Sequence, residues 1–318
     1  MKVWLTLLLA FTLHAPAFAL SMNGFNLDNS LVPANQIFRG GPPRDGIPAL
    51  DHPRFETADK ANWLEEEDLV LGVTIDGEAK ASSVRILVWH EIVNDTLGDT
   101  PIAVTYCPLC GSGIVFSRQQ EEQILDFGVS GLLHNSDLLM YDRQSESLWS
   151  QIPGKAISGP RVGDVLERLA VTHTSWQRWR AEHPDSQVLS IKTGHKRDYN
   201  ATPYSGYEQA YTLYFPVQNR DRRFHPKELV IGLAEDGKAK TWPFAELQKS
   251  DGKIEDTFAG QPVTVLYDDR TQTARVHDAN GTQLPATTVF WFAWYTFYPQ
   301  TDVYMHPQQT PSTTRRKP

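Results

Sequence analysis

The stretch DLVLGVTIDGEAKA, residues 68–81, decides the fold because it occurs a second time in the chain. Residues 228–241 read ELVIGLAEDGKAKT and share the acid-Leu-Val-aliphatic-Gly start, the Asp-Gly pair and the Ala-Lys pair. Self-similarity of this kind is the sequence signature of a repeated structural unit. The match predicts two related halves that arose by an internal duplication.

Two further matches continue in the same order along the chain. TPIAVTYC at 100–107 resembles QPVTVLYD at 261–268, one residue out of step. SWQRWRAEHPDSQVL at 175–189 resembles FWFAWYTFYPQTDVY at 290–304, with Trp-x-x-Trp in both. The alternating segments predict strands, and the Trp-x-x-Trp segments predict short helices. We therefore expect a β-rich α+β fold.

The matches also divide the chain into segments. We expect a signal peptide at 1–19, an N-terminal segment at 20–59, a first repeat at 60–192, a connector at 193–224, a second repeat at 225–304 and a disordered tail at 305–318.

The first twenty residues predict export. One Lys precedes an apolar run, and the small residues of Ala17-Phe18-Ala19 follow it, which is the layout of a cleaved secretory signal. The mature chain then starts at about Leu20 and is periplasmic or secreted. The formal net charge of −8 argues against a general nucleic-acid partner. No apolar run is long enough for stable membrane insertion.

Both cysteines of the chain lie at one hairpin tip. Each half carries two predicted strands joined by a short turn, and in the second half the turn is DDRTQT at 268–273. In the first half the same place reads CPLCGS, with Cys107 and Cys110. The shared fold does not require cysteines, because one copy lacks them. We infer that they were added to the first half for a function.

A second addition lies in the same half. The first repeat is longer than the second between its hairpin and its Trp-x-x-Trp helix, and the surplus around 127–160 predicts short strands and turns. Its chemically active side chains are His134, Asn135, Asp137, Tyr141, Asp142, Arg143, Glu146 and Trp149. We expect the functional site where this insertion meets the cysteines.

Several of these segments resemble one bacterial family. TYCPLCGSGIVFSR, FGVSGLLHNSDLLMYDRQSESLWSQ, TSWQRWRAEHPDSQVLS and ATPYSGYEQ followed by FPV are similar to the family known as domain of unknown function 3179 (DUF 3179). The resemblance covers roughly 60–300. It implies an exported protein whose characteristic segments are the cysteine hairpin and the insertion, and it carries no established activity.

Three interpretations of the cysteine hairpin remain open. A structural disulfide would suit an oxidising compartment, although a ring this small contributes only about 2 kcal/mol. A redox pair would exchange disulfides through a thiolate. A metal knuckle would use both sulfurs and favour copper or zinc. Its further ligands would come from His134, Asp137, Met140, Asp142 or His90.

A rival interpretation places function in the insertion alone. Asp142, Arg143 and Glu146 would then form a substrate-binding or hydrolytic site for a small molecule, with the paired carboxylates doing acid–base work on a sugar or peptide substrate. Asn135, Tyr141 and Trp149 would contact that substrate, and the cysteines would only brace the hairpin. A third possibility is a non-catalytic module that binds a periplasmic protein.

Overall fold

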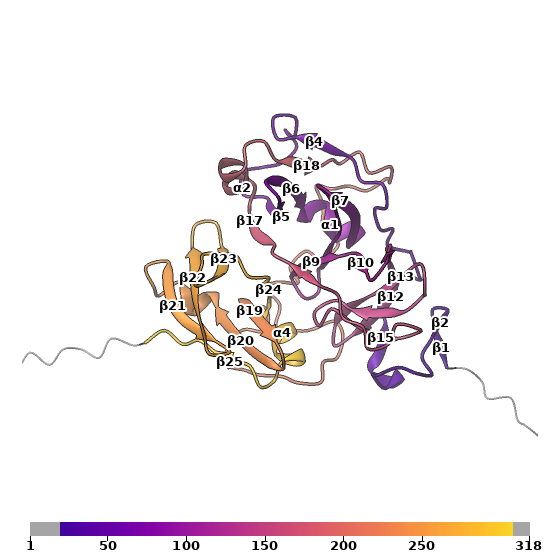
Figure 1. Cartoon of the computed structure of the whole chain (residues 1–318). Helices are drawn as coiled ribbons and strands as arrows, with labels where there is room; N and C mark the ends of the chain where they lie inside the picture. The colour runs from indigo at the N-terminus through magenta and orange to yellow at the C-terminus, as the bar shows by residue number, and fades with distance from the viewer. Residues whose placement is uncertain (1–19, 308–318) are drawn as a thin grey trace, which may run out of the picture.

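The computed structural model describes residues 20–307 and confirms a β-rich chain (Figure 1). Five sheets of three or more strands are arranged in a ring that resembles a five-bladed β-propeller. The predicted signal peptide and residues 308–318 of the predicted tail lie outside the described residues. None of the helices in the described part is long and apolar enough to cross a membrane.

The first half contains two of these sheets. Their elements are β4 (Phe55–Thr57), β5 (Leu69–Ile75), β6 (Glu78–Ser83), α1 (Val84–His90), β7 (Ile92–Leu97), β8 (Thr100–Cys107), β9 (Ser112–Ser117), β16 (Arg168–Leu169), β17 (Thr172–Ser175), α2 (Trp176–Glu182) and β18 (Gln187–Leu189). One sheet has the order β17-β5-β6-β18-β4, and the other has the order β16-β9-β8-β7.

The second half repeats this arrangement, but each of its two sheets has one strand fewer. Its elements are β19 (Leu229–Glu235), β20 (Lys238–Pro243), α3 (Phe244–Leu247), β21 (Lys253–Phe258), β22 (Gln261–Asp268), β23 (Thr273–Asp278), β24 (Thr287–Phe290), α4 (Trp291–Phe297) and β25 (Asp302–Val303). The orders β24-β19-β20-β25 and β21-β22-β23 match those of the first half. In both halves the strand after the Trp-x-x-Trp helix forms a parallel pair: β18 pairs with β6, and β25 pairs with β20.

The fifth sheet has no counterpart in the second half, and it combines the first repeat with a strand of the N-terminal segment. It has the order β15-β14-β13-β12-β3 and contains the predicted insertion. Its strands are β3 (Ile37–Arg39), β12 (Phe127–His134), β13 (Asp137–Asp142), β14 (Leu148–Ser150) and β15 (Lys155–Ser158). The remaining short elements are β1 (Ser21–Met22), β2 (Phe25–Asn26), η1 (Ala34–Gln36), β10 (Gln119–Gln120) and β11 (Gln123–Ile124).

In each repeat, a helix packs on its sheet through a tryptophan that lies directly over a glycine. Trp179 of α2 packs on Gly72 of β5, where a Cβ atom would lie 2.1 Å from the indole ring. Trp294 of α4 packs on Gly232 of β19, where a Cβ would lie 2.5 Å from the ring. Both indole N–H groups are satisfied, because Trp179 donates to Ser186 at 2.9 Å and Trp294 donates to Thr301 at 3.0 Å. The repeated Gly and Trp of the sequence are therefore one packing unit.

The two halves contact each other reciprocally. Strand β17 of the first half lies beside β23 of the second, and β24 of the second lies beside β9 of the first. The Phe290 N–H donates to the Cys110 carbonyl at 2.8 Å, so the second half holds the cysteine hairpin at its tip. The largest core cluster includes both cysteines together with residues of the fifth sheet and of α4. The second half thus helps to position the site.

The Gly–Trp packing predicts a large effect of one methyl group. Gly72→Ala and Gly232→Ala should each lower the free energy of unfolding by about 1–3 kcal/mol, because the new Cβ overlaps a buried indole ring. Gly40→Ala is the control, since a Cβ there meets Leu133 at an ordinary 3.4 Å. Chemical denaturation measures all three. Equal stability of the three variants would contradict this account of the repeat.

Candidate metal centre

The cysteine hairpin places both sulfurs inside the protein. Strands β8 and β9 pair in register up to Cys107 opposite Ser112, and the Cys110 N–H closes the tip by donating to the Cys107 carbonyl at 3.1 Å. Gly111 follows with φ +60°, and a Cβ there would lie 2.8 Å from the Phe290 ring. Cys107 is 2 % exposed and Cys110 is fully buried, and both thiols are free.

A second hairpin tip lies against these sulfurs. Asn135 and Ser136 join β12 to β13 with φ values of +55° and +66°, as in the two-residue type I′ turns of hairpins. The Ser136 carbonyl accepts from the Cys110 thiol at 3.3 Å and from the Cys107 thiol at 3.8 Å. The turn therefore brings the next residue, Asp137, to the cysteines.

Cys107, Cys110 and Asp137 form one compact group of potential ligands. The two sulfurs and one carboxylate oxygen all lie within 4.8 Å of one another, and all three residues are buried. Asp137 Oδ2 accepts from the Ile152 N–H at 2.9 Å and from the Ser150 hydroxyl at 3.2 Å. Its Oδ1 is buried and has no hydrogen-bond partner among the described residues. One oxygen thus orients the carboxylate, and the other remains available.

Burial disfavours the charged forms of this group. It raises the pKa of Asp137 to about 7, although the hydrogen bonds from Ile152 and Ser150 oppose the shift. Burial also raises the pKa of the Cys110 thiol, and the hydrogen bond and charge of Cys107 and the charge of Asp137 raise it further. A bound cation would favour the deprotonated forms and offset the cost of burying them.

Glu91 is a neighbour that the sequence patterns did not indicate. It lies between α1 and β7 and is 6 % exposed. Burial raises the pKa of Glu91 to about 8, and the negative charge of Asp137 contributes to the rise. The charge of Glu91 in turn raises the pKa of Cys110. Glu91 therefore lies close enough to interact electrostatically with the group, whereas its neighbour His90, which was a candidate ligand from the sequence, does not join it.

The connector covers the site, which the sequence analysis also did not predict. Tyr207 is 1 % exposed, and its buried hydroxyl has no partner among the described residues. Tyr207 packs in the core cluster that contains both cysteines, and burial and then the charges of the two cysteines raise its pKa. The connector is tied to the second hairpin tip, because Ser136 donates to the Phe215 carbonyl at 2.9 Å.

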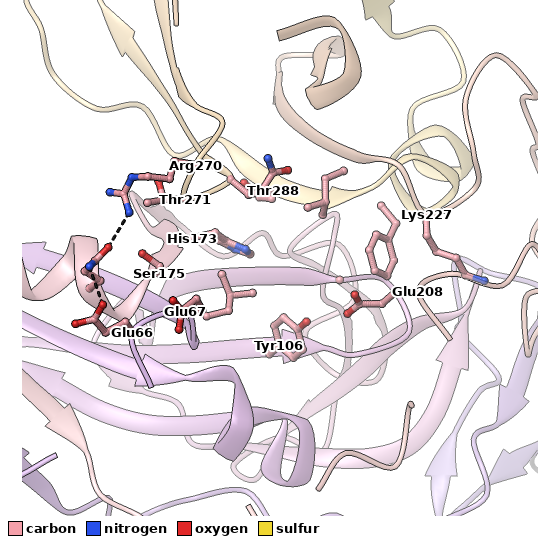
Figure 2. A pocket seen from close by; sticks show the side chains of 16 residues that line it. Glu66, Glu67, Tyr106, His173, Ser175, Glu208, Lys227, Arg270, Thr271 and Thr288 are labelled. Carbon is pink, nitrogen blue, oxygen red and sulfur yellow. Dashed lines mark hydrogen bonds between the residues drawn. The ribbon is translucent and has the colours of Figure 1, made fainter. Parts of the chain in front are cut away.

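A cleft of about 770 Å³ lies beside the cysteine hairpin (Figure 2). Tyr106 and Gly111 of the hairpin form part of its wall. Figure 2 shows His173 and Ser175 of β17 on the side of the first half and Arg270 of the second half on the opposite side. The cleft therefore runs between the two halves and reaches residues adjacent to both cysteines.

The structure separates the candidate histidines from this group. His134 is not within 4.8 Å of the three donors, and its Nε2 lies 3.3 Å from the Asn135 amide. His90 is also outside, because its ring nitrogens bond the Pro48 carbonyl and the Tyr199 hydroxyl, each at 2.7 Å. Met140 is buried in the same core cluster as the cysteines. Of the histidines and acids named from the sequence, only Asp137 joins the cysteines in the described part.

Asp142 belongs to a structural turn. It accepts hydrogen bonds from the Ser145 N–H at 2.6 Å, the Ser145 hydroxyl at 2.7 Å and the indole N–H of Trp149 at 2.9 Å. Trp149 is fully buried. Both carboxylate oxygens of Asp142 are therefore occupied, and the structure does not bring Asp142 to the sulfurs.

Arg143 and Glu146 lie in separate surface ion pairs. Arg143 pairs with Asp45 and Asp51, while the half-exposed Glu146 pairs with Arg44 at 2.9 Å.

The expected substrate contacts are also occupied within the protein. The Tyr141 hydroxyl donates to Asp45 at 2.6 Å and accepts from Arg143 at 2.8 Å. The Asn135 amide oxygen accepts from the Gln218 N–H at 2.9 Å. These side chains hold turns together and do not converge on the buried group.

Comparison with known proteins gives one match. The model of a family described as "Protein of unknown function (DUF3179)" matches residues 44–301, which is most of the chain. The search of curated proteins and the search of solved structures gave no match. The match includes the cysteine hairpin, Asp137 and the connector, and it agrees with the resemblance seen in the sequence. The chain therefore belongs to the DUF3179 family.

Proposed function

We propose that this protein binds a thiophilic metal ion, zinc, through Cys107, Cys110 and Asp137. The observation that carries the proposal is the donor set itself. Two sulfurs and a carboxylate oxygen lie within 4.8 Å of one another, and Asp137 Oδ1 has no other partner among the described residues. Zinc ligands at 2.0–2.3 Å from one ion are separated by distances of this size.

The chemistry of the donors favours zinc over copper(I). Zinc accepts thiolate, imidazole and carboxylate ligands, whereas copper(I) favours soft sulfur donors. The third donor is the hard oxygen of Asp137, and neither His134 nor His90 joins the group. Three protein ligands would leave one tetrahedral position for water or substrate, as in catalytic zinc sites. Such an ion would supply Lewis acidity beside the cleft.

The same geometry gives less support to disulfide exchange. The attacking species in that reaction is a thiolate that a partner can reach. Cys107 and Cys110 are almost completely buried, and burial raises the pKa of Cys110. The hairpin also lacks a helix N-terminus at the cysteines, since β8 and β9 flank them directly. These properties describe ligands better than redox-active nucleophiles.

The internal repeat supports function in the first half. We propose that the halves arose by duplication, since they share strand order and the Gly–Trp packing unit. At the equivalent hairpin tip the second half has Asp268 and Thr271 in place of the cysteines. We further propose that the chain acts after export, as the N-terminal sequence predicts.

Zinc titration tests the proposed ligands. The wild-type protein should bind one zinc ion per chain, Cys107→Ser should abolish tight binding, and Asp137→Asn should weaken it by about 10–100-fold. Competition with a chromophoric chelator measures these affinities. Thiol and carboxylate ligands release protons on binding, so the apparent affinity should fall as the pH is lowered.

Thr271→Ser is the matched control, because Thr271 occupies the position of Cys110 in the second half. Its zinc affinity should equal that of the wild type. If all four proteins bind zinc equally, these residues are not the ligands. A site that prefers copper(I) to zinc would contradict the choice of metal.

The raised pKa of Asp137 predicts a pH dependence of stability. The pKa is about 7 in the folded protein and lower in the unfolded chain, so the unfolded chain loses its proton first as the pH rises. The free energy of unfolding of the metal-free protein should therefore fall between pH 5 and pH 8, relative to Asp137→Asn, by a few kcal/mol. The histidine contributions are shared by both proteins and cancel in this comparison.

Zinc should reduce this pH-dependent loss of stability, because it stabilises the charged carboxylate. Urea denaturation with chelator and with zinc provides the test. Parallel pH profiles for the wild type and Asp137→Asn would show that Asp137 does not titrate in the folded protein as described.

A further inference from the structure

Glu91 has an unfavourable backbone conformation for its residue type. It ends α1 with φ +58° and ψ −29°, and its N–H donates to the Leu87 carbonyl at 2.7 Å. Helices commonly end in this left-handed region with glycine, because other residues have a steric conflict there. Its carbonyl accepts from the Tyr106 N–H at 2.8 Å, which joins the end of the helix to the cysteine strand.

The second half shows what this position requires when no site is present. Gly252 occupies the equivalent place with φ +92°, and its carbonyl accepts from the Tyr267 N–H at the same distance of 2.8 Å. The repeated fold therefore needs a left-handed residue and one carbonyl at this point. Neither requirement calls for a carboxylate. The first half has glutamate at this position, and it is also the half that carries the cysteines.

The side chain of Glu91 has a second unfavourable feature. The residue is 6 % exposed, and its carboxylate oxygens are not among the fully buried atoms without a partner in the described part, so they reach water. Burial of most of the side chain still disfavours the charged carboxylate and raises its pKa to about 8. The backbone bond to Tyr106, the residue before Cys107, places Glu91 beside the proposed metal centre, and its charge contributes to the raised pKa of Cys110. Backbone and side chain thus both disfavour glutamate here, and such strain is characteristic of functional sites.

We propose that Glu91 is a positioning residue of the metal centre, which contacts a water molecule on the open side of the ion. This inference rests on the proposed binding of zinc by Cys107, Cys110 and Asp137. A direct bond from Glu91 to the same ion does not fit the structure, because Glu91 is not among the groups within 4.8 Å of one another. A contact through water satisfies this separation, and the carboxylate oxygens are accessible to water.

Replacement by the residue of the second half is the sharpest test. Glu91→Gly should raise the melting temperature of the metal-free protein by about 2–4 °C, because it removes the strained conformation and the buried acid. The same variant should weaken zinc binding by about 10–100-fold. Glu91→Gln keeps the shape and the strain but lacks the charge, and it should also weaken binding.

Glu121→Gly is the matched control. Glu121 is exposed and has a similar φ of +53°, so this variant relieves the same kind of backbone strain far from the proposed ligands in sequence. It should leave zinc affinity unchanged. Cobalt-substituted proteins provide a spectroscopic readout of the role of Glu91. In Glu91→Gly the thiolate-to-cobalt absorption should persist while the d–d bands shift, because the thiolates still bind and the open side has changed.

The outcomes separate this inference from the proposed function. If the wild type binds zinc and both Glu91 variants bind it equally well, the inference is wrong and the ligand assignment stands. If Glu91→Gly lowers the melting temperature of the metal-free protein, Glu91 serves the fold and the inference is also wrong. If the wild type binds no zinc, the proposed function fails and this inference fails with it.

Discussion

The central physical constraint is the burial of three acidic groups, two thiols and one carboxyl, where two hairpin tips of the first half meet. Cys107, Cys110 and Asp137 meet where the β8–β9 tip lies against the β12–β13 tip. Asp137 forms no ion pair among the described residues, and although the charge of Arg168 lowers its pKa, burial dominates and raises the pKa to about 7. Buried charges are normally paired or bound to metal. A cation would supply the missing charge, and the fifth sheet and the connector surround the position it would take.

The repeat explains why so much of the protein surrounds so few reactive groups. The second half holds the cysteine tip through the Phe290 N–H and forms one side of the cleft. It also serves as an internal reference, because it keeps the fold and lacks the candidate ligands. Asp268, Thr271 and Gly252 occupy the positions of Cys107, Cys110 and Glu91.

The sequence predicts the repeated architecture because local patterns encode it. The Asp-Gly pairs form the turns after β5 and β19, and each repeated glycine lies beneath a tryptophan. The choice of ligand is harder to predict. His134 and Asp137 flank the same two-residue turn, and the docking of that hairpin on the cysteines decides which one reaches the sulfurs. Tyr207 belongs to a connector without regular structure, so no periodicity indicates that it covers the site. Glu91 becomes visible only by comparison with Gly252.

X-ray absorption at the zinc edge tests the central claim most directly, because it reports the atoms bound to the metal. The protein loaded with one equivalent of zinc should show two sulfur scatterers at about 2.3 Å and oxygen scatterers at about 2.0–2.2 Å. Cys107→Ser should lose sulfur scattering, while Thr271→Ser should retain the wild-type spectrum. A zinc shell without sulfur, or one with imidazole ligands in place of oxygen, would contradict the assignment to Cys107, Cys110 and Asp137.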